Sequence, residues 1–418
     1  MARTLSGPAR RVASLDVDLL TESKTLSDEL VALRRRLHGI PEVGLQLPVT
    51  QRALLDEIAD LGLEISTGDA VSSITGVLRG GKNTGDGPVV LLRGDMDGLP
   101  VVELTGEPYA PAADSPHHDA MHACGHDLHM SGLVGAARLL AAHSGELPGD
   151  VVFMFQPGEE GFDGARYMVD EGVLEAAGKR VDAAYGLHVF SGYFPKGTIA
   201  ARPGPLMAAS AGLHVRVIGA GGHGSAPHMS KDPIPAAAEM VTALQTLVTR
   251  AFNVFDPVVI TVGSFHAGTK RNIIPDQAVF EATVRSFSPE AAKKAAELTV
   301  RLCEQIAAAH GLTVEATFEG EYPVTVNNPD EYEFAAGVAR DLFGDDRFTE
   351  MPDPLTGSED FSRVLNEVPG AYVFVGASKG DPATSSSNHS PLAAFDDAVL
   401  PDCAALLAEL AWRRLNRS

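Results

Sequence analysis

Short apolar runs along the chain each lead into a cluster of polar residues. The run VVLLR leads into Gly94–Asp97, VVFMF leads into Gln156–Glu160, and AAYGL ends at His188. A further run, AYVFVG, precedes the loop that holds Asn388 and His389. Helical stretches such as MSGLVGAARLLAAH lie between the runs. Continuous apolar strands that alternate with helices predict an α/β domain with a mostly parallel sheet, which binds its ligands beyond the carboxyl ends of the strands.

The pattern changes between residues 208 and 320. There, amphipathic helices and strands follow one another in the order β-α-β-β-α-β, which is the ferredoxin-like order of a complete small α+β domain. Because the α/β pattern resumes afterwards, we predict an insertion that splits the larger domain into residues 25–207 and 321–418. Residues 1–24 are expected to form a flexible tail.

Composition narrows the classes of function. A chain of 418 residues with 44% hydrophobic and 21% charged residues is typical of a globular protein with two domains. The formal charge of −22 would repel phosphate backbones, so nucleic acid is not an expected partner. The apolar runs are far shorter than a membrane span, so no membrane partner is expected either. Three scattered cysteines form no disulfide framework and suit a cytoplasmic protein.

One of these cysteines lies in the stretch MHACGHDLH, where Cys124 and His126 are separated only by Gly125. That spacing lets a thiolate and an imidazole converge on one ion, and both are good ligands for a borderline metal such as zinc. Three further ligand candidates each lie just past a predicted strand: Glu160, His188 and His389. Five ligands are too many for one tetrahedral ion. The set therefore predicts two ions that share a bridging group.

Two other interpretations of Cys124 stay open on these residues alone. A single cysteine is most often a small buried hydrophobic residue. It could also be a nucleophile with His126 or His129 as its base, although such bases usually come from distant parts of the sequence. Sensitivity to chelators rather than to alkylating agents would favour the metal site.

The turn QPGEEG and the turn RGDMDGLP supply candidate acids. Adjacent side chains point in different directions, so Glu160 can bind metal while Glu159 faces the substrate as general base and later protonates the leaving nitrogen. Asp97 is the candidate that orients a metal-bound histidine. The alternatives are a solvent-exposed acidic turn for the glutamates and a capped turn ending at Pro100 for the aspartate.

Several motifs together resemble a known family. The chain is similar to dinuclear metallo-amidohydrolases of the aminoacylase/hippurate hydrolase type, in the branch with the auxin-conjugate hydrolases; the wider group includes carboxypeptidase G and succinyl-diaminopimelate desuccinylase. The resemblance covers about residues 25–415. The motifs that carry it are LRRRLHGIPEVGL, LLRGDMDGLPV, MHACGHDLHM, FQPGEEGFDGARYMV, GLHV, GGHGSAPHMSKDPI, NIIPDQA and NHSPLAAF.

The resemblance implies metal binding by the same five residues and acid/base catalysis by Glu159. In the wider family an aspartate bridges the ions and a histidine takes the place of Asp95, whereas this chain has the cysteine variant. The expected metals are therefore manganese or zinc, with nickel or cobalt as alternatives.

The resemblance also implies that the inserted domain is a lid and dimerisation domain. His223, in GGHGSAPH, resembles a histidine that reaches a catalytic site and stabilises the oxyanion. Asn272 resembles a lid residue that contacts substrate, and Arg285 is a candidate clamp for a substrate carboxylate. The structural alternatives are a histidine of a glycine-rich turn for His223, a turn asparagine for Asn272 and a strand-edge arginine for Arg285. Whether His223 serves its own subunit or a neighbour is open.

The expected function is hydrolysis of the amide bond of an N-acyl amino acid to a carboxylic acid and an amino acid. The acyl group could be acetyl, benzoyl or indoleacetyl. A metallo-dipeptidase or carboxypeptidase is the first alternative, and a non-catalytic relative that binds acylated ligands is the second. We expect a homodimer or larger homo-oligomer. Asp127 and His129 receive no role from the sequence.

Overall fold

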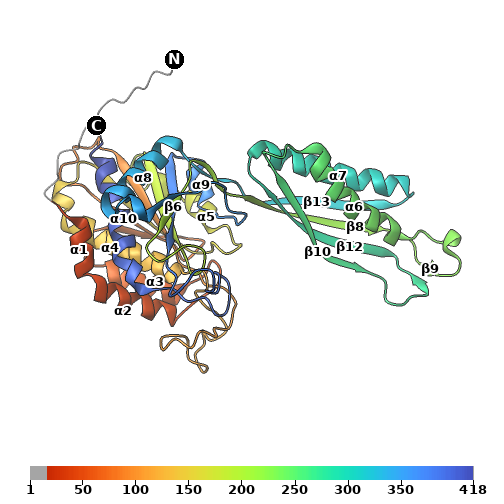
Figure 1. Cartoon of the computed structure of the whole chain (residues 1–418), viewed down its shortest axis with the longest axis horizontal. Helices are drawn as coiled ribbons and strands as arrows, with labels where there is room; N and C mark the ends of the chain where they lie inside the picture. The colour runs from red at the N-terminus through yellow and green to blue at the C-terminus, as the bar shows by residue number, and fades with distance from the viewer. Residues whose placement is uncertain (1–16, 418) are drawn as a thin grey trace, which may run out of the picture.

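The computed structural model describes residues 17–417 and shows two domains, a large one and a lid domain that projects from it (Figure 1). The large domain contains an eight-stranded sheet with the order β1-β2-β4-β3-β5-β16-β6-β15. Its four central strands run parallel, and every residue of β3, β4 and β16 is buried. Antiparallel pairs occur only toward the edges, at β1-β2, β2-β4 and β16-β6. The strands are β1 (Glu64–Thr67), β2 (Ile74–Leu78), β3 (Val89–Asp95), β4 (Asp150–Gln156), β5 (Ala183–Phe190), β6 (Ile199–Ala201), β15 (Phe348–Glu350) and β16 (Gly370–Gly376).

Helices cover both faces of this sheet because its apolar side chains alternate between two cores. On β3, Val90 and Leu92 belong to the core beneath α4 and α10, whereas Val89 and Leu91 belong to the core on the side of α5 and α9. The helices of the domain are α1 (Leu19–Thr25), α2 (Ser27–His38), α3 (Pro48–Ile58), α4 (His126–Ala142), α5 (Gly164–Asp170), α8 (Pro329–Phe343), α9 (Ser362–Leu365) and α10 (Leu400–Leu415).

Helix α1 corrects part of the predicted tail. Residues 1–16 lie outside the described residues, but Leu19–Thr25 are helical. The carboxylate of Asp18 accepts a hydrogen bond from the Thr21 amide at 2.9 Å and caps the helix, and the side chain of Leu19 is fully buried in the core shared with α10. The tail prediction is wrong for this segment, because a capped helix with Leu19 and Ser23 buried packs there against α10 and α4.

The lid domain has its own core and the predicted ferredoxin-like order. Its four strands are antiparallel in the order β10-β12-β8-β13, and both helices pack on one face. On β8, Leu213 and Val215 are buried beneath the helices, while His214 and Arg216 are exposed on the other face. The predicted fold class is confirmed. The elements are β8 (Ala209–Ile218), α6 (Pro233–Ala251), β10 (Val258–Ala267), β12 (Gln277–Ser286), α7 (Pro289–Ala309) and β13 (Thr313–Tyr322).

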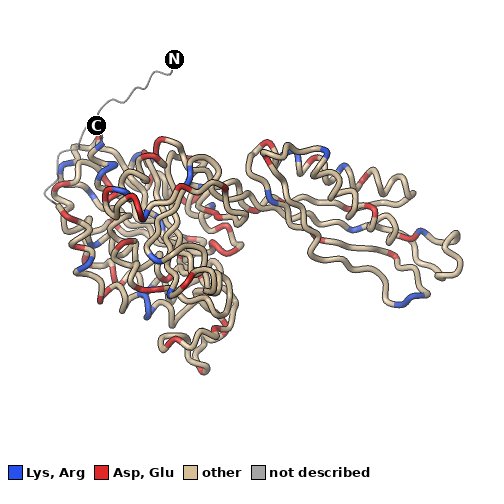
Figure 2. The backbone as a smooth tube through the Cα atoms, viewed as in Figure 1, with Lys and Arg blue, Asp and Glu red and all other residues tan. Residues whose placement is uncertain are grey.

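Small pairs of strands complete the lid and its junction with the large domain. At the far end of the lid, β9 (Gly222–His223) pairs with β11 (Ile273–Ile274), and at the junction β7 (Gly204–Met207) pairs with β14 (Thr325–Asn327). Acidic and basic residues are spread over both domains (Figure 2). Within residues 17–417, every helix is too short or too polar to cross a lipid bilayer.

Candidate metal centre and catalytic cleft

The turn between Cys124 and His126 depends on glycine. Gly125 has φ +83°, and a Cβ atom there would lie 2.4 Å from Cγ2 of Val189. Glycine is the residue that adopts such a φ without strain, and this site also has no room for a methyl group. The chain therefore turns sharply, with Cys124 before the turn and His126 as the first residue of α4.

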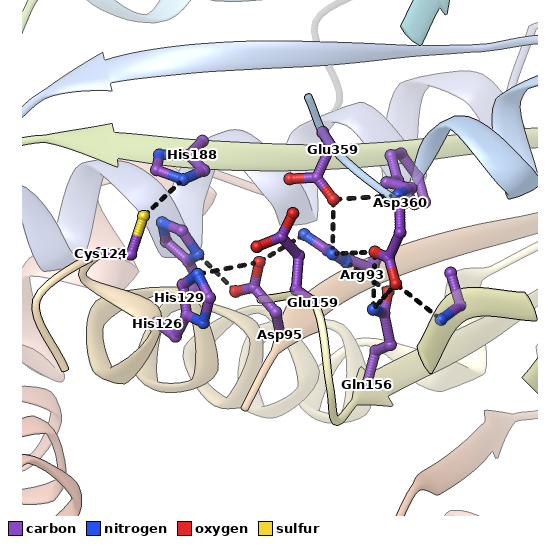
Figure 3. A network of polar contacts seen from close by, with 12 residues as sticks. Arg93, Asp95, Cys124, His126, His129, Gln156, Glu159, His188, Glu359 and Asp360 are labelled. Atoms are coloured by element: carbon purple, nitrogen blue, oxygen red, sulfur yellow. Dashed lines mark hydrogen bonds and ion pairs between the residues drawn. The ribbon is translucent and has the colours of Figure 1, made fainter. Parts of the chain in front are cut away.

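The first candidate ligand set consists of Cys124, His126 and His188, whose ligand atoms all lie within 4.8 Å of one another. His188, on β5, donates from Nδ1 to the Val189 carbonyl at 2.8 Å, which leaves Nε2 3.3 Å from the Cys124 sulfur (Figure 3). Burial lowers the pKa of His188 well below its usual range, so the ring is neutral, as a metal ligand must be.

The imidazole of His126 is oriented in the same way as that of His188, by a hydrogen bond from Nδ1 to a main-chain carbonyl. Its Nδ1 donates to the main-chain carbonyl of Asp97 at 2.8 Å, and its buried Nε2 has no hydrogen-bond partner among the described residues. A fully buried imidazole nitrogen without a partner is costly unless another group binds it. Its position in the ligand set fits a metal ion.

The second candidate set consists of Cys124, Glu160 and His389, again with ligand atoms within 4.8 Å of one another. Nε2 of His389 is 3.2 Å from the Cys124 sulfur and 3.2 Å from a Glu160 oxygen. His389 has φ +69°, an uncommon conformation for a residue with a side chain, and its amide donates to the Ala123 carbonyl at 2.9 Å. Cys124 belongs to both sets, so its sulfur lies within 4.8 Å of the ligand atoms of each.

Glu159 lies beside these sets and is buried. Burial, followed by the nearby carboxylates of Glu359 and Glu160, raises the pKa of Glu159 well above its ordinary value. A carboxylate that holds a proton more readily is suited to accept one from water and to release it to a leaving group.

The carboxylate of Asp97 makes different contacts from those predicted. It accepts hydrogen bonds from the amides of Glu159 at 2.9 Å and Glu160 at 3.1 Å, while its distance to Nδ1 of His126 is 3.7 Å. The main-chain carbonyl of Asp97 orients the histidine instead. The side chain of Asp97 therefore fixes the loop that carries both glutamates.

A buried ionic network next to the site was not predicted (Figure 3). The Arg93 guanidinium contacts Asp95 at 2.6 Å, Glu359 at 2.7 Å and Asp360 at 3.1 Å. Burial alone would raise the pKa of Asp95, but Arg93 and two histidines lower it well below its ordinary value. An arginine inside the otherwise apolar run VVLLRG is the sequence signal for this network, because a fully buried arginine needs acidic partners.

The two residues without a predicted role are structural links. His129 lies 2.5 Å from Asp95 through Nδ1, and its Nε2 accepts the Val189 amide at 2.8 Å. It thereby connects Asp95 to the strand that carries His188. Asp127 is buried and lies 2.7 Å from both Arg34 and His38 of α2, which anchors the start of α4.

A cleft of about 920 Å³ opens over the ligand sets and is lined by both domains. Glu159, Glu160, His188 and His389 line it from the large domain, and Arg285 lines it from the lid. Nη1 of Arg285 is buried without a hydrogen-bond partner among the described residues, 3.9 Å from the Glu321 carboxylate. The apolar lining is formed by Phe190, Tyr193, Met207 and Leu355.

The other two predicted lid residues do not line this cleft. His223 and Asn272 lie next to each other at the far end of the lid, where the Gly224 amide donates to the Asn272 carbonyl at 2.9 Å. Both residues are exposed, and β9 lies at the end of the lid away from the large domain (Figure 1). Within one chain, therefore, the structure brings together the five ligand candidates, Glu159, Asp97 and Arg285, but not His223 or Asn272.

Several known proteins are similar to this chain. The model of the Peptidase family M20/M25/M40 matches residues 91–413. The chain is 36% identical over 403 residues to thermostable carboxypeptidase 2 of Saccharolobus solfataricus, covering 96% of this chain and 98% of the relative. It is 35% identical over 400 residues to an IAA-amino acid hydrolase of Arabidopsis thaliana, covering 95% and 88%.

Solved structures give the same result. A dinuclear metal-binding peptidase of Bacillus subtilis matches with a TM-score of 0.80 and 31% identity, covering 94% of this chain and 99% of that one. The family resemblance inferred from the motifs is confirmed. The chain belongs to the peptidase family M20/M25/M40.

Proposed function

We propose that the protein is a metal-dependent amidohydrolase that cleaves N-acyl amino acids into a carboxylic acid and an amino acid. The observation that carries the proposal is the pair of ligand sets that share Cys124, placed beside the buried Glu159 in a cleft that Arg285 lines from the lid. The relation to an IAA-amino acid hydrolase supports this substrate class. The three cysteines are free, which suits a cytoplasmic enzyme.

The donor set fits two divalent ions. The residues that would hold them are Cys124, which belongs to both sets, and His126, His188, Glu160 and His389. Thiolate and imidazole donors suit zinc, whereas carboxylate suits manganese, so we propose one of these two metals, with nickel and cobalt as alternatives. When bound, the ions would polarise the substrate carbonyl and lower the pKa of water.

The chain's own residues then carry the proton transfers. The Glu159 carboxylate accepts the proton of the attacking water and delivers it to the amide nitrogen as the carbon–nitrogen bond breaks. Asp97 holds the main chain of Glu159 in place during both transfers. The Arg93 network fixes Asp95, and through His129 it also fixes the strand that carries His188.

Arg285 is proposed to bind the substrate carboxylate. Replacing it with alanine is expected to raise KM by about 10- to 10²-fold with a smaller change in kcat, because a charge-assisted hydrogen bond formed on binding is lost. Steady-state kinetics on one N-acyl amino acid measures the effect. Arg216→Ala is the control, since Arg216 lies on the exposed face of the same sheet and pairs with Glu315. An unchanged KM for Arg285→Ala would contradict the assignment.

His223 is proposed to act in the cleft of a second copy of the chain. Two observations support this: its exposed position at the far end of the lid, and the edge strand β10, which pairs only with β12 within residues 17–417 and exposes Val259 and Phe265. Unpaired strand edges are sites where two chains associate. Asn272 would reach the partner's cleft together with His223.

Mixing two inactive variants tests this arrangement. His223→Ala and Glu159→Gln, unfolded and refolded together in equal amounts, are expected to regain roughly a quarter of wild-type activity, because half of the dimers are hybrids and each restores one of its two sites. Each variant refolded alone is the control. Inactive hybrids of confirmed dimeric mass would place His223 in the site of its own subunit, and full activity of His223→Ala alone would place it outside the reaction.

A metallo-dipeptidase or carboxypeptidase is the second candidate, favoured by the relation to a thermostable carboxypeptidase. A carboxylate clamp at Arg285 serves a peptide C-terminus equally well. A panel of acetyl-, benzoyl- and indoleacetyl-amino acids and dipeptides, assayed after chelation and with each metal added back, separates the two. If the protein is an N-acyl-amino-acid hydrolase, then after a metal is added back it should turn over at least one N-acyl amino acid faster than every dipeptide. Activity that survives chelation and is lost on alkylation would instead favour a thiol hydrolase, and binding without turnover would favour a non-catalytic relative.

A further inference from the structure

Tyr322 connects the lid to the loop of the catalytic glutamate. It is the last residue of β13, the strand by which the chain returns from the lid to the large domain, and its side chain is 8% exposed. Its hydroxyl donates a hydrogen bond to the main-chain carbonyl of Glu159 at 2.6 Å. The same oxygen accepts the amides of Gly161 at 2.8 Å and Asp163 at 3.3 Å. One hydroxyl thus satisfies three main-chain groups of a single loop.

Arg363 makes a second connection between the same two segments. Its guanidinium binds both carboxylate oxygens of Asp163 at 2.9 Å and donates to the Glu321 carbonyl at 2.7 Å. Asp163 has φ +57°, a conformation that costs free energy for a residue with a side chain and persists only where neighbouring contacts hold it. The loop from Glu159 to Asp163 is therefore shaped by its contacts with the end of β13.

The main chain of Glu159 is held from two sides. The Asp97 carboxylate accepts its amide at 2.9 Å, and the Tyr322 hydroxyl donates to its carbonyl at 2.6 Å. These contacts fix the two peptide planes that flank the Cα atom of Glu159. A displacement of about 1 Å can reduce the rate of an enzymatic reaction about 10²-fold. Fixing both peptide planes therefore matters for Glu159, whose carboxylate must lie within reach of the attacking water.

We propose that Tyr322 is a positioning residue for the reaction: its hydroxyl fixes the main chain of Glu159 to the strand that leads back from the lid. The inference rests on the proposed role of Glu159. The competing explanation is that the tyrosine ring only fills space, since it lines both the catalytic cleft and a cavity of about 330 Å³ at the junction. Phenylalanine distinguishes the two, because it keeps the ring and removes only the hydroxyl.

Tyr322→Phe at saturating metal is expected to lower kcat by about 10- to 10²-fold with KM changed by less than about threefold. The control is Tyr332→Phe. Tyr332 is also buried, and its hydroxyl donates to the Glu350 carboxylate at 3.0 Å, away from the cleft. The control should keep kcat within about twofold of wild type. Equal kcat values for the two variants would overturn the proposal.

Hydrogen–deuterium exchange tests the contact without any substrate. In Tyr322→Phe, the Asp163 amide loses its acceptor and the Gly161 amide keeps only its 2.8 Å contact with the Glu159 carbonyl, so both should exchange faster, whereas Tyr332→Phe should leave them unchanged. Unaltered exchange of both amides would overturn the proposal even if kcat fell. This measurement gives its answer even if wild type hydrolyses none of the substrates, a result that would refute only the proposed function.

A double variant tests whether Tyr322 acts through Glu159. In the Glu159→Gln background, Tyr322→Phe should cause no further loss of the residual rate, because both changes remove the same step. A further loss as large as that caused in wild type would show that the hydroxyl acts independently of Glu159 and would overturn the proposal.

Discussion

Replacing Glu159 with glutamine is expected to lower kcat by about 10²- to 10⁴-fold while the metal content stays unchanged. Glutamine has nearly the same shape but cannot accept the proton of the attacking water. The two sets that share Cys124 do not include Glu159, so both should persist, although an oxygen of Glu159 also lies within 4.8 Å of ligand atoms of His126 and Glu160. Turnover of an N-acyl amino acid, measured together with elemental analysis of the purified protein, gives both quantities.

A control variant accompanies this experiment. Glu175→Gln is a control, because Glu175 is exposed and, among the described residues 17–417, its carboxylate pairs only with Arg180, at 2.6 Å. Its kcat should equal that of wild type. Full activity in Glu159→Gln would refute the assigned proton transfer, and loss of metal together with activity would mean that Glu159 is itself a ligand.

Replacing Cys124 with alanine is expected to have a comparably large effect through a different cause. The sulfur lies 3.3 Å from His188 and 3.2 Å from His389, so its loss removes a donor from both sets at once. Changes at groups that merely support a metal ligand already cost 10- to 100-fold in affinity or activity, so we expect a loss of at least about 10²-fold in metal affinity. Metal titration followed by elemental analysis measures it.

Cys303 and Cys403 provide matched controls for this change. Both are fully buried, and burial raises the pKa of Cys303 to about 12, so its thiol stays protonated and inert. Alanine at either position should leave metal binding unchanged. Cys124→Ala with wild-type metal content and activity would remove the thiolate from the ligand set. If alkylation inactivates the protein after metal removal but not before, the thiolate is a ligand rather than a free nucleophile.

The strands, the insertion and the convergence of the ligand candidates were predictable because each depends on local patterns. Apolar runs mark buried parallel strands, and the carboxyl ends of such strands share one edge of the sheet. That rule places Glu160, His188 and His389 near Cys124 without any knowledge of their separation along the chain. The αL conformation of Gly125 was not predicted, because the spacing of Cys124 and His126 fits an extended segment as well as a turn.

The remaining contacts depend on packing between distant segments. Arg93 and Glu359 are 266 positions apart, and no periodicity links them. For Asp97, the residue was predicted, but only the fold shows that its carboxylate faces two amides and that its carbonyl faces the histidine. The position of His223 was unpredictable for another reason, since a motif does not reveal how far the lid extends from the large domain.

The place of β16 in the sheet affects how the protein can be assembled during synthesis. β16 lies between β5 and β6, although both precede it by more than the whole lid domain. The lid has a separate core and can fold as soon as its last strand emerges from the ribosome. In the large sheet, in contrast, the edges of β5 and β6 that pair with β16 stay unpaired until residues 370–376 are made. A metal site that includes both Cys124 and His389 would consequently form only after His389 has been translated.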